Sequence, residues 1–424
     1  MFSLGTNVIL ARSLGPEGRG IYAVAILIPA IVALLAQLGF QAANVYHTSK
    51  RLLPMDDIVG HAVSLAFLLG AFCYVLIFGY VELTHAPQFL GIGSQFVLVS
   101  CIALPFTLLT IFVQGIQQGA ERFVQFNTVL LTQYAAPAVA LLIALVLLRG
   151  ETLQAVEAWT AAAITTSLVA ASGVSRVGRL SPRLNLTTLR RLFRFGIVSY
   201  LSTLTSFVNY RFDVFLVNFF AGARQVGLYS VGTGLAEVIW YLSNAAGIVL
   251  APRVAGAERE VGDRVTEAVT RVVALLAVLA AGALAVLAPF VVVLFFGEAF
   301  EESKWAVWLL LPGIVTFSVG RILSMYLLGR GRLKVDLFAS FVGFALTLTL
   351  DLLLIPRFGF RGAAVASSIA YSVAMLVNLT WVVRNSSITM RGLLVARPSD
   401  VAMLMTRVRQ IAGSGLSVLS SRRR

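Results

Sequence analysis

The sequence predicts an all-α, polytopic integral membrane protein. Hydrophobic residues make up 58% of the 424 positions, charged residues make up only 12%, and the mean hydropathy is +0.89. In an ordinary soluble domain about a quarter of the residues are charged. The apolar residues come in long runs, and a bilayer core roughly 30 Å thick needs about 20 such residues for each helical crossing. We therefore expect membrane-spanning helices joined by short polar segments.

Eleven apolar runs have the length of a complete crossing. They cover 21–45, 59–81, 92–116, 124–148, 155–175, 196–219, 227–251, 268–296, 304–328, 335–355 and 361–383. A shorter run, 2–10, precedes them and leads into the polar decapeptide ARSLGPEGRG, 11–20. Irregular polar backbone is excluded from the hydrocarbon core, so we expect the decapeptide to be a loop between helices. We expect the run 2–10 to be the last half of a truncated first helix, which puts in doubt whether residue 1 is the true start.

The lysines and arginines predict how the chain is oriented. Cytoplasmic loops carry the excess of these residues, and alternate loops hold 24 on one side and 7 on the other. The side with 24 includes the loop 176–195 and the C-terminal tail, so we expect both to be cytoplasmic and 11–20 to face outward. We attribute the net charge of +14 to this topology and to anionic lipid headgroups, and not to nucleic acid.

An internal repeat divides the chain. A shift of 207 residues lays ARSLGPEGRGIYAVA (11–25) over NFFAGARQVGLYSVG (218–232), with four identities. Gly15 matches Gly222, Gly20 matches Gly227, Tyr22 matches Tyr229 and Val24 matches Val231. At an offset of 210, Gly119 and Arg122 match Gly329 and Arg332. Two halves with the same orientation predict a pseudo-two-fold axis along the membrane normal, with substrate bound between them.

The repeat and the charge pattern predict four parts. They are an N-terminal transmembrane lobe (1–178), a basic cytoplasmic linker (179–195), a C-terminal transmembrane lobe (196–384) and a basic cytoplasmic tail (385–424). Within the tail, 399–413 places Val401, Leu404, Val408 and Ile411 on one helical stripe. This spacing predicts an amphipathic helix that lies on the membrane surface.

Several of these segments are similar to one family. ARSLGPEGRGIYAVA resembles the loop after the first helix of polysaccharide-export flippases, the Wzx-type O-antigen (lipid-linked oligosaccharide) flippases of the multidrug/oligosaccharidyl-lipid/polysaccharide exporter superfamily. The segment 212–232 resembles that family's mid-chain repeat of the motif, and 294–315 and 350–371 resemble its C-terminal half. The resemblance covers residues 9 to about 384.

The resemblance implies a V-shaped, alternating-access transporter of two six-helix lobes in the cytoplasmic (inner) membrane of the cell. It implies a flippase that moves an undecaprenyl-diphosphate-linked oligosaccharide to the outer leaflet, for the biosynthesis of cell-surface polysaccharide such as the O-antigen of lipopolysaccharide. Membrane lipids and the polysaccharide polymerase machinery are the further partners it implies.

Ionisable residues inside the predicted spans are the first candidates for a functional site, because a charge there costs about 2.5–3.5 kcal/mol even on an insertion scale. The candidates are Arg211, Asp213, Glu237, Arg321 and Asp351. We expect Arg211 and Arg321 to contact a diphosphate, because a guanidinium offers phosphate two parallel donors. For Arg211, an ion pair with Glu237 is an equally weighted alternative. Asp213 and Glu237 are candidates for coupling to a proton or sodium gradient, whereas we favour a structural role for Asp351.

Uncharged polar residues near the ends of two spans are candidates for binding sugar hydroxyls. The group includes Asn44, Gln114 and Gln118. The same residue types form hydrogen bonds between membrane helices, and for any single residue we favour that structural interpretation.

No enzymatic site is predicted. The sequence shows no Ser/His/Asp or Cys/His set, no phosphate-binding glycine loop with its lysine, no paired acidic motif and no metal-ligand spacing, and we expect no cofactor beyond the coupling ion. A multidrug or cation exporter of the same superfamily is the closer alternative, which the span arginines disfavour because cation exporters use acidic cavities. A membrane glycosyltransferase or polymerase is a distant alternative, since it predicts a large outer loop or a clustered acidic motif.

Overall fold

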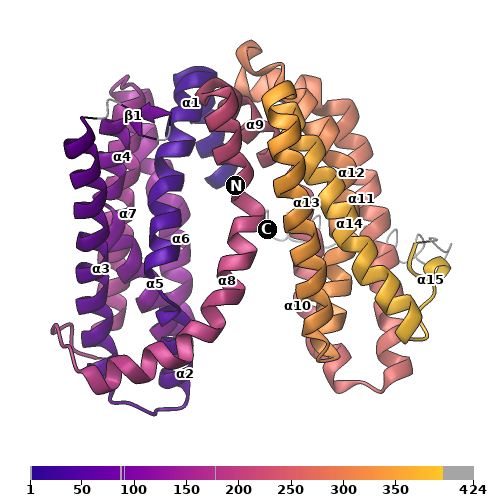
Figure 1. Ribbon diagram of the computed structural model, residues 1–424, viewed down its shortest axis with the longest axis horizontal. Coiled ribbons are helices and arrows are strands. Elements are labelled where there is room, and N and C mark those ends of the chain that lie inside the picture. The colour runs from indigo at the N-terminus through magenta and orange to yellow at the C-terminus, as the bar shows by residue number, and fades with distance from the viewer. Residues whose placement is uncertain (1, 86–87, 90, 177, 395–424) are drawn as a thin grey trace, which may run out of the picture. The chain divides into compact units, whose positions relative to one another are not determined.

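The computed structural model describes residues 2–85, 88–89, 91–176 and 178–394, and nearly all of them are helical (Figure 1). The first part of the chain forms α1 Phe2–Ala36, α2 Phe40–Ser49, α3 Met55–Thr84, α4 Ser94–Cys101, α5 Leu104–Gly119, α6 Phe123–Leu141, α7 Thr152–Val174 and α8 Leu186–Ala221. A two-residue antiparallel ribbon, β1 Gln88–Phe89 with β2 Ile92–Gly93, precedes α4.

The second part continues from α8 without strands in the residues described. Its helices are α9 Ala223–Ala236, α10 Trp240–Gly256, α11 Arg259–Phe296, α12 Ser303–Gly329, α13 Leu333–Phe358, α14 Phe360–Asn385 and α15 Met390–Leu394. Short turns of other helix types occur in both parts of the chain, namely η1 Leu142–Leu147 after α6, η2 Glu237–Ile239 and η3 Glu298–Phe300. The amphipathic helix predicted for 399–413 lies outside the described residues.

In the described part of the chain, nine helical segments are long and apolar enough to cross a membrane. They correspond to nine of the eleven predicted spans, so the protein is a multi-pass membrane protein. The other two predicted spans, 155–175 and 196–219, coincide with α7 and its C-cap Ser175 and with part of α8. Helix α7 is rich in hydroxyl side chains, and those of Thr160, Thr165 and Thr166 donate to carbonyl groups one turn earlier in the helix. These three hydroxyl groups are therefore satisfied within the helix.

The predicted loop at 11–20 is wrong in form. Helix α1 contains a kink at Gly15, where φ is 65° and ψ is −176°, and the chain is helical on both sides. Only glycine adopts this backbone conformation readily, and Pro16 suits the first position of the helix that follows. The polar decapeptide is therefore a corner of a single residue flanked by helix ends.

Two predicted spans are interrupted, which corrects the expectation of single helices. The span 21–45 breaks at Gln37–Gly39, where Leu38 and Gly39 have positive φ. A Cβ atom on Gly39 would lie 2.0 Å from the carbonyl oxygen of Gly196 in α8, so the break lets two backbones meet. The span 92–116 breaks between α4 and α5, just before Pro105, which has no N–H for the helix ladder.

The repeat found in the sequence has a structural counterpart at the corners. Gly222 has φ 81° and ψ 171°, close to the conformation of Gly15. A Cβ atom on Gly20 would lie 1.7 Å from the oxygen of Ala223, and one on Gly227 would lie 1.8 Å from the oxygen of Pro16. Since Pro16 and Ala223 are themselves 207 residues apart, each corner packs on the other in the same way. Such reciprocal packing agrees with an internal duplication.

Helix ends further along the chain repeat as well. Glu121 and Gly331 both have positive φ, and so do Arg149 and Gly359. Both pairs have the offset of 210 at which Gly119 and Arg122 match Gly329 and Arg332. The duplication therefore extends from the first corner to the end of α13.

The chain divides into two compact units. Unit 1 comprises the chain up to Gly232 with Pro289–Ala306 and Leu350–Ala363, and unit 2 comprises Thr233–Ala288, Val307–Thr349 and the chain from Ala364 onward. In unit 1, Gly115 and Gly119 of α5 let this helix approach the backbone of α2 closely. In unit 2, helices α10, α11, α12 and α14 enclose an apolar core that includes Leu250, Val273, Leu323 and Leu379. The predicted lobes 1–178 and 196–384 stay a prediction.

The start of the predicted tail is packed on unit 2. Asp263 of α11 accepts hydrogen bonds from the backbone and the hydroxyl of Ser387, at 3.0 and 2.8 Å. One turn later, Glu267 accepts from the backbone of Thr389 at 2.8 Å. Leu393 of α15 is fully buried. Helix α15 is therefore a fixed part of this unit.

Candidate substrate and coupling sites

The basic linker predicted at 179–195 is held against unit 1 by its polar groups. Arg183 forms an ion pair with Asp57 at 2.9 Å, and the backbone of Arg179 donates to Asp56 at 2.9 Å. Nε2 of the buried His61 accepts a hydrogen bond from the backbone of Asn185 at 2.8 Å, while its Nδ1 lies 2.6 Å from the carbonyl oxygen of Asp57. The ring therefore joins the linker to α3.

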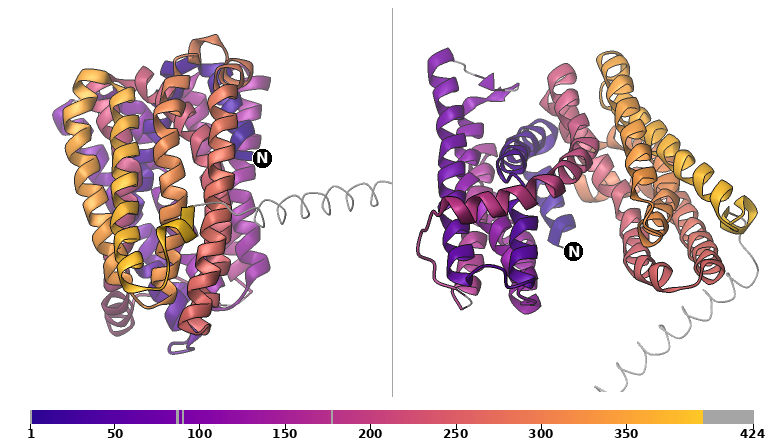
Figure 2. Two further views of the ribbon diagram at one scale, coloured as in Figure 1. Left: turned by 90° about the vertical axis from the view of Figure 1, so that its right-hand side faces the viewer. Right: turned by 60° about the horizontal axis from the view of Figure 1, so that its bottom comes forward.

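The first turns of α8 are amphipathic and pack on α2. Asn185 caps the helix, because its side chain accepts from the backbone of Thr187 at 2.9 Å. The rings of Phe195 and Tyr46 stack with centroids 4.0 Å apart, and Phe193 lies 6.4 Å from Phe40. These contacts place a short basic helical segment over the ends of α2 and α3 (Figures 1 and 2).

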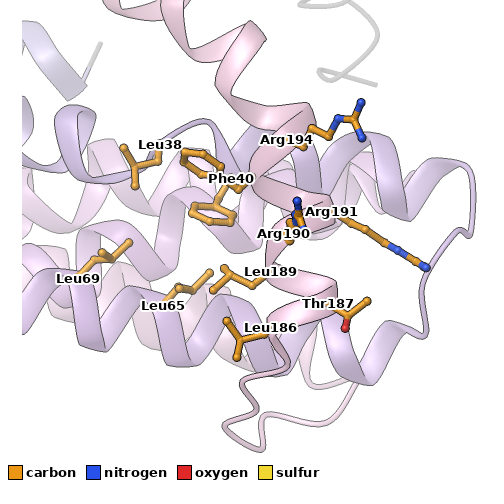
Figure 3. A pocket seen from close by; sticks show the side chains of 11 residues that line it. Leu38, Phe40, Leu65, Leu69, Leu186, Thr187, Leu189, Arg190, Arg191 and Arg194 are labelled. Atoms are coloured by element: carbon orange, nitrogen blue, oxygen red, sulfur yellow. The ribbon is translucent and has the colours of Figure 1, made fainter.

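A cavity of about 910 Å³ lies beneath this segment. Its walls are mostly apolar, and three arginines of α8 belong to its lining. The lining comprises Leu38, Phe40, Leu65, Leu69, Leu186, Thr187, Leu189, Arg190, Arg191, Phe193 and Arg194. Figure 3 shows Leu186 and Leu189 on the side of Leu65 and Leu69, whereas Arg191 and Arg194 extend from the other side of the helix. The lining thus combines an apolar surface with three arginine side chains of α8.

That combination suits one chemical class of ligand. Arginine pairs with phosphate oxygens through two parallel N–H donors, and leucine and phenylalanine side chains bury hydrocarbon. None of the residues that line the cavity has an acidic side chain. A lipid that carries phosphate groups matches both halves of the cavity, whereas an organic cation would be repelled by the arginines.

The corner contains a buried arginine that the sequence assigned to an outer loop. Arg19 is 4% exposed and donates to Asn7 Oδ1 at 3.2 Å, to the Asn7 carbonyl at 2.9 Å and to Ser230 Oγ at 3.0 Å. The kink at Gly15 turns residue 19 back toward the first part of α1, which explains the error. Because its donors are engaged with the protein, Arg19 ties the two corners together.

Asp213, one of the two predicted ion-coupling residues, belongs to a buried cluster in unit 1. Its Oδ2 accepts from the hydroxyl of Tyr229 at 2.5 Å, and its Oδ1 accepts from the backbone of Val214 at 2.8 Å. Asp351 of α13 is 1% exposed, its Oδ1 has no hydrogen-bond partner, and it is close enough to Asp213 for the two charges to interact. This cluster therefore contains two carboxyl groups and a tyrosine hydroxyl.

The second predicted ion-coupling residue, Glu237, does not belong to the same unit as Asp213. Glu237 lies in η2, in unit 2, so the two predicted ion-coupling residues belong to different units. The side chain of Arg211, and with it the alternative pairing to Glu237, lies outside the described residues. These roles stay predictions.

Arg321 shares a helix face with Phe317, a member of an aromatic cluster that the sequence did not reveal. Its Nε donates to Asn244 Oδ1 at 3.0 Å. The ring centroids of Trp240 and Phe317 are 4.4 Å apart, and those of Phe317 and Tyr371 are 5.2 Å apart. The spacing i, i+4 was the available signal, because Trp240 with Asn244 and Phe317 with Arg321 each fall on one helix face. Arg321 is therefore half-buried, with a polar partner on α10 and an aromatic residue one turn earlier on its own helix.

The uncharged candidates lie at helix contacts in unit 1. Asn44 is 2% exposed and donates to the carbonyl of Phe112 at 3.2 Å. Gln114 is 7% exposed and donates to Gln133 Oε1 at 3.2 Å, whereas Gln118 is exposed. Asn44 thus lies at the contact of α2 with α5, Gln114 bonds from α5 to α6, and Gln118 takes part in neither contact. Their role in binding sugars stays a prediction.

Solved structures share the fold of the chain. The inward closed conformation of the lipid II flippase MurJ matches with a TM-score of 0.78 and 13% identity, over 96% of this chain and 90% of that one. The inward-facing conformation of a multidrug resistance MATE family transporter of the MOP superfamily matches with a TM-score of 0.71 and 16% identity, over 90% and 92%. A MOP superfamily transporter from Pyrococcus furiosus matches with a TM-score of 0.57 and 17% identity, over 90% of each chain. The predicted fold class is confirmed.

The chain also matches a sequence family. No protein with a curated description matches it. A family described as polysaccharide biosynthesis protein matches residues 9–305, which is well over half of the chain. The motifs at both corners fall inside this range, as do the cavity and the linker above it. The chain therefore belongs to the polysaccharide biosynthesis protein family.

Proposed function

We propose that the protein is a flippase that moves a lipid-diphosphate-linked oligosaccharide across the cell membrane for the biosynthesis of cell-surface polysaccharide. The observation that carries this proposal is the cavity of about 910 Å³, in which leucine side chains adjoin Arg190, Arg191 and Arg194. An isoprenoid chain fits the apolar wall and a diphosphate fits the arginines. Undecaprenyl diphosphate is the carrier we propose, and O-antigen or another glycan of the lipopolysaccharide type is the cargo class. The protein acts as a transporter and not as an enzyme.

The family and the fold support the same conclusion. The family description names polysaccharide biosynthesis, and one structure with this fold is described as a flippase of lipid II. Basic residues on one side of the membrane favour a cytoplasmic position for the linker and the C-terminus. The proposed direction of transport is thus from the linker side of the inner membrane to the side of the corners, where a polysaccharide polymerase would receive the product.

Beyond this cavity, we propose that Arg211 and Arg321 attract the diphosphate along the transport path. Asn44, Gln114 and Gln118 are the proposed contacts for sugar hydroxyls. For Arg321, the rings of Trp240, Phe317 and Tyr371 add apolar surface of the kind that packs on sugars. Asn244 already accepts a hydrogen bond from Nε of Arg321, and this bond fixes the orientation of the guanidinium.

Transport is proposed to be coupled to a proton or sodium gradient through Asp213, with Glu237 as the second candidate. The cluster of Asp213, Tyr229 and Asp351 supports this, because it joins α8, α9 and α13 through groups whose charge a bound ion would change. Binding of an ion there would alter the balance between helix arrangements. The structural role expected for Asp351 and a role in coupling are compatible.

Export of cationic drugs is the second candidate, favoured by the likeness to a multidrug resistance MATE transporter. Reconstitution distinguishes the two. Proteoliposomes with the purified protein are expected to expose a fluorescent lipid-diphosphate-linked oligosaccharide to an external lectin, faster than empty vesicles do. Uptake of a cationic dye without movement of the lipid-linked oligosaccharide would show that the protein is a drug exporter.

A further inference from the structure

A second cavity, of about 650 Å³, lies between α13 and α14 in unit 2. On α14 the lining forms a single stripe along one face of the helix, because its residues are separated alternately by three positions and by one. They are Val373, Leu376, Val377, Thr380, Trp381 and Arg384. Lys334, Val335 and Phe338 line it from α13. The stripe from Val373 to Arg384 is about 16 Å long at 1.5 Å per residue. The cavity is therefore an elongated groove along two neighbouring helices.

One end of this groove is cationic. Lys334 and Arg384 are both exposed there, and Asn385 adds an amide. The guanidinium of Arg332 lies 5.9 Å from the centre of the Trp381 ring, so a third positive charge stands at the same end. No carboxylate belongs to the residues that line the groove.

The nearest acid on α13 is engaged elsewhere. Asp336 Oδ1 accepts from Ser324 Oγ at 2.5 Å and from Asn378 Nδ2 at 2.9 Å. It is two residues from both Lys334 and Phe338, which places it on the other side of the helix. The positive charges at the end of the groove are therefore not neutralised by this carboxylate.

The rest of the groove is apolar and open. Phe338 is 60% exposed and Leu376 is 49% exposed, and Val373 and Val377 continue the same surface. An acyl chain on this surface would bury hydrocarbon on both helices. Besides the indole of Trp381, only Thr380 and Asn385 add uncharged polar side chains. The hydroxyl of Thr380 already donates to the carbonyl of Leu376 at 2.7 Å, and the amide of Asn385 donates to the carbonyl of Trp381 at 2.9 Å. The groove therefore has little with which to bind a glycan.

We propose that this groove binds an anionic glycerophospholipid of the adjacent leaflet. The phosphate group lies at Lys334, Arg384 and Arg332, and one acyl chain follows Phe338, Leu376 and Val373. Phosphate pairs with lysine and arginine through charge-assisted hydrogen bonds, and polybasic sites at a membrane surface attract anionic headgroups. Such a lipid bridges α13 and α14. The proposal is independent of what the protein transports.

The test compares lipids on the full-length protein. Native mass spectrometry of the purified chain, exchanged into detergent with equal amounts of phosphatidylglycerol and phosphatidylcholine, gives the retained lipid. The double variant Lys334→Gln/Arg384→Gln is compared with Lys50→Gln/Arg51→Gln, which removes two exposed cations at the end of α2. The wild type and the control are expected to retain phosphatidylglycerol preferentially, and the groove variant is expected to retain at least about tenfold less.

A second variant tests the apolar half. Val377→Trp fills the groove without changing its charge, and it is expected to reduce retention of phosphatidylglycerol and to leave the elution volume of the protein unchanged. Equal retention of the two lipids by the wild type would overturn the proposal, as would unchanged phosphatidylglycerol on both groove variants. Displacement of phosphatidylglycerol by an equimolar polyprenyl diphosphate would also overturn it, since the groove would then belong to the substrate.

Discussion

At the scale of single residues, burial separates polar groups that hold the fold from those that can act. Arg19 is buried and its donors are engaged with Asn7 and Ser230, so it serves the fold. Asp351 is equally buried, but one carboxylate oxygen lacks a partner and Asp213 is near. A buried polar atom without a hydrogen bond is costly, and its retention favours a function for Asp351.

If the cluster of Asp213 and Asp351 couples transport to an ion gradient, a change in one carboxyl group should abolish the coupling. Asp351→Asn keeps the shape of the side chain but removes one of two ionisable groups. We expect the rate of flipping driven by an imposed proton or sodium gradient to fall to the rate without a gradient. The matched control is Glu301→Gln, which changes an exposed carboxylate outside the helices. Gradient-stimulated flipping that survives in Asp351→Asn would remove this cluster from the coupling mechanism.

His47 predicts a pH dependence of stability. Burial, and then the positive charge of Arg191, lower the pKa of His47 below its ordinary value of 6.5. Above pH 6.5 the ring is neutral in both the folded and the unfolded chain. As the pH falls through 6.5, the unfolded chain binds a proton that the folded chain resists, so the free energy of unfolding decreases until the lower, folded-state pKa is reached.

Thermal unfolding in detergent between pH 8 and pH 5 measures this effect. His47→Phe retains an aromatic ring beside Phe195 and is expected to lose less stability than the wild type at the acidic end. Arg191→Gln removes the smaller cause and is expected to have an intermediate effect. If His47→Phe and the wild type decline in parallel, His47 does not account for the acid sensitivity.

At the scale of elements, the packing of the two corners determines how α1 and α9 meet. Gly20 and Gly227 each face a backbone carbonyl at a distance that no Cβ atom tolerates. A backbone carbonyl cannot rotate away as a side chain can, so a substitution must separate the helices.

We expect Gly20→Ala and Gly227→Ala each to lower the free energy of unfolding by about 3 kcal/mol, at the upper end of the cost of overpacking. Gly282→Ala in α11 is the matched control, because a Cβ atom there would meet nothing within 4 Å. Thermal unfolding of the purified variants measures the difference. Equal stability of Gly20→Ala and Gly282→Ala would contradict the close approach of the corners.

The sequence predicted the existence of the helices better than their interruptions. Hydropathy depends on composition, and it located the spans within a few residues of α3, of α6 together with η1, and of α12, α13 and α14. The break at Gln37–Gly39 depends on contact with Gly196, which is 157 residues from Gly39. No local pattern shows such a contact. The kink at Gly15 was mistaken for a loop because charge and glycine content are the same in a loop and in a tight corner.

At the scale of the whole molecule, the repeat connects sequence, fold and function. Matching residues at offsets of 207 and 210 were visible in the sequence, and the structure shows the same backbone conformation at the matched corners. The cavity beneath α8 was not visible, because Leu65 and Leu69 are separated from Arg190 by more than a hundred residues. Only the amphipathic start of α8 hinted at it, through leucines and arginines that alternate at helical spacing.

The central claim is that the arginines of this cavity bind the diphosphate of a lipid-linked oligosaccharide that the protein flips. The most direct measurement is the initial rate of flipping in proteoliposomes for Arg190→Gln/Arg194→Gln against Arg176→Gln/Arg179→Gln, a control with the same loss of charge whose residues do not line the cavity. Hydrogen bonds to charged groups contribute about 1.5–3 kcal/mol each, so the account predicts that the cavity variant is at least about tenfold slower at low substrate concentration, with the control near the wild type. Equal rates for the two variants would contradict it.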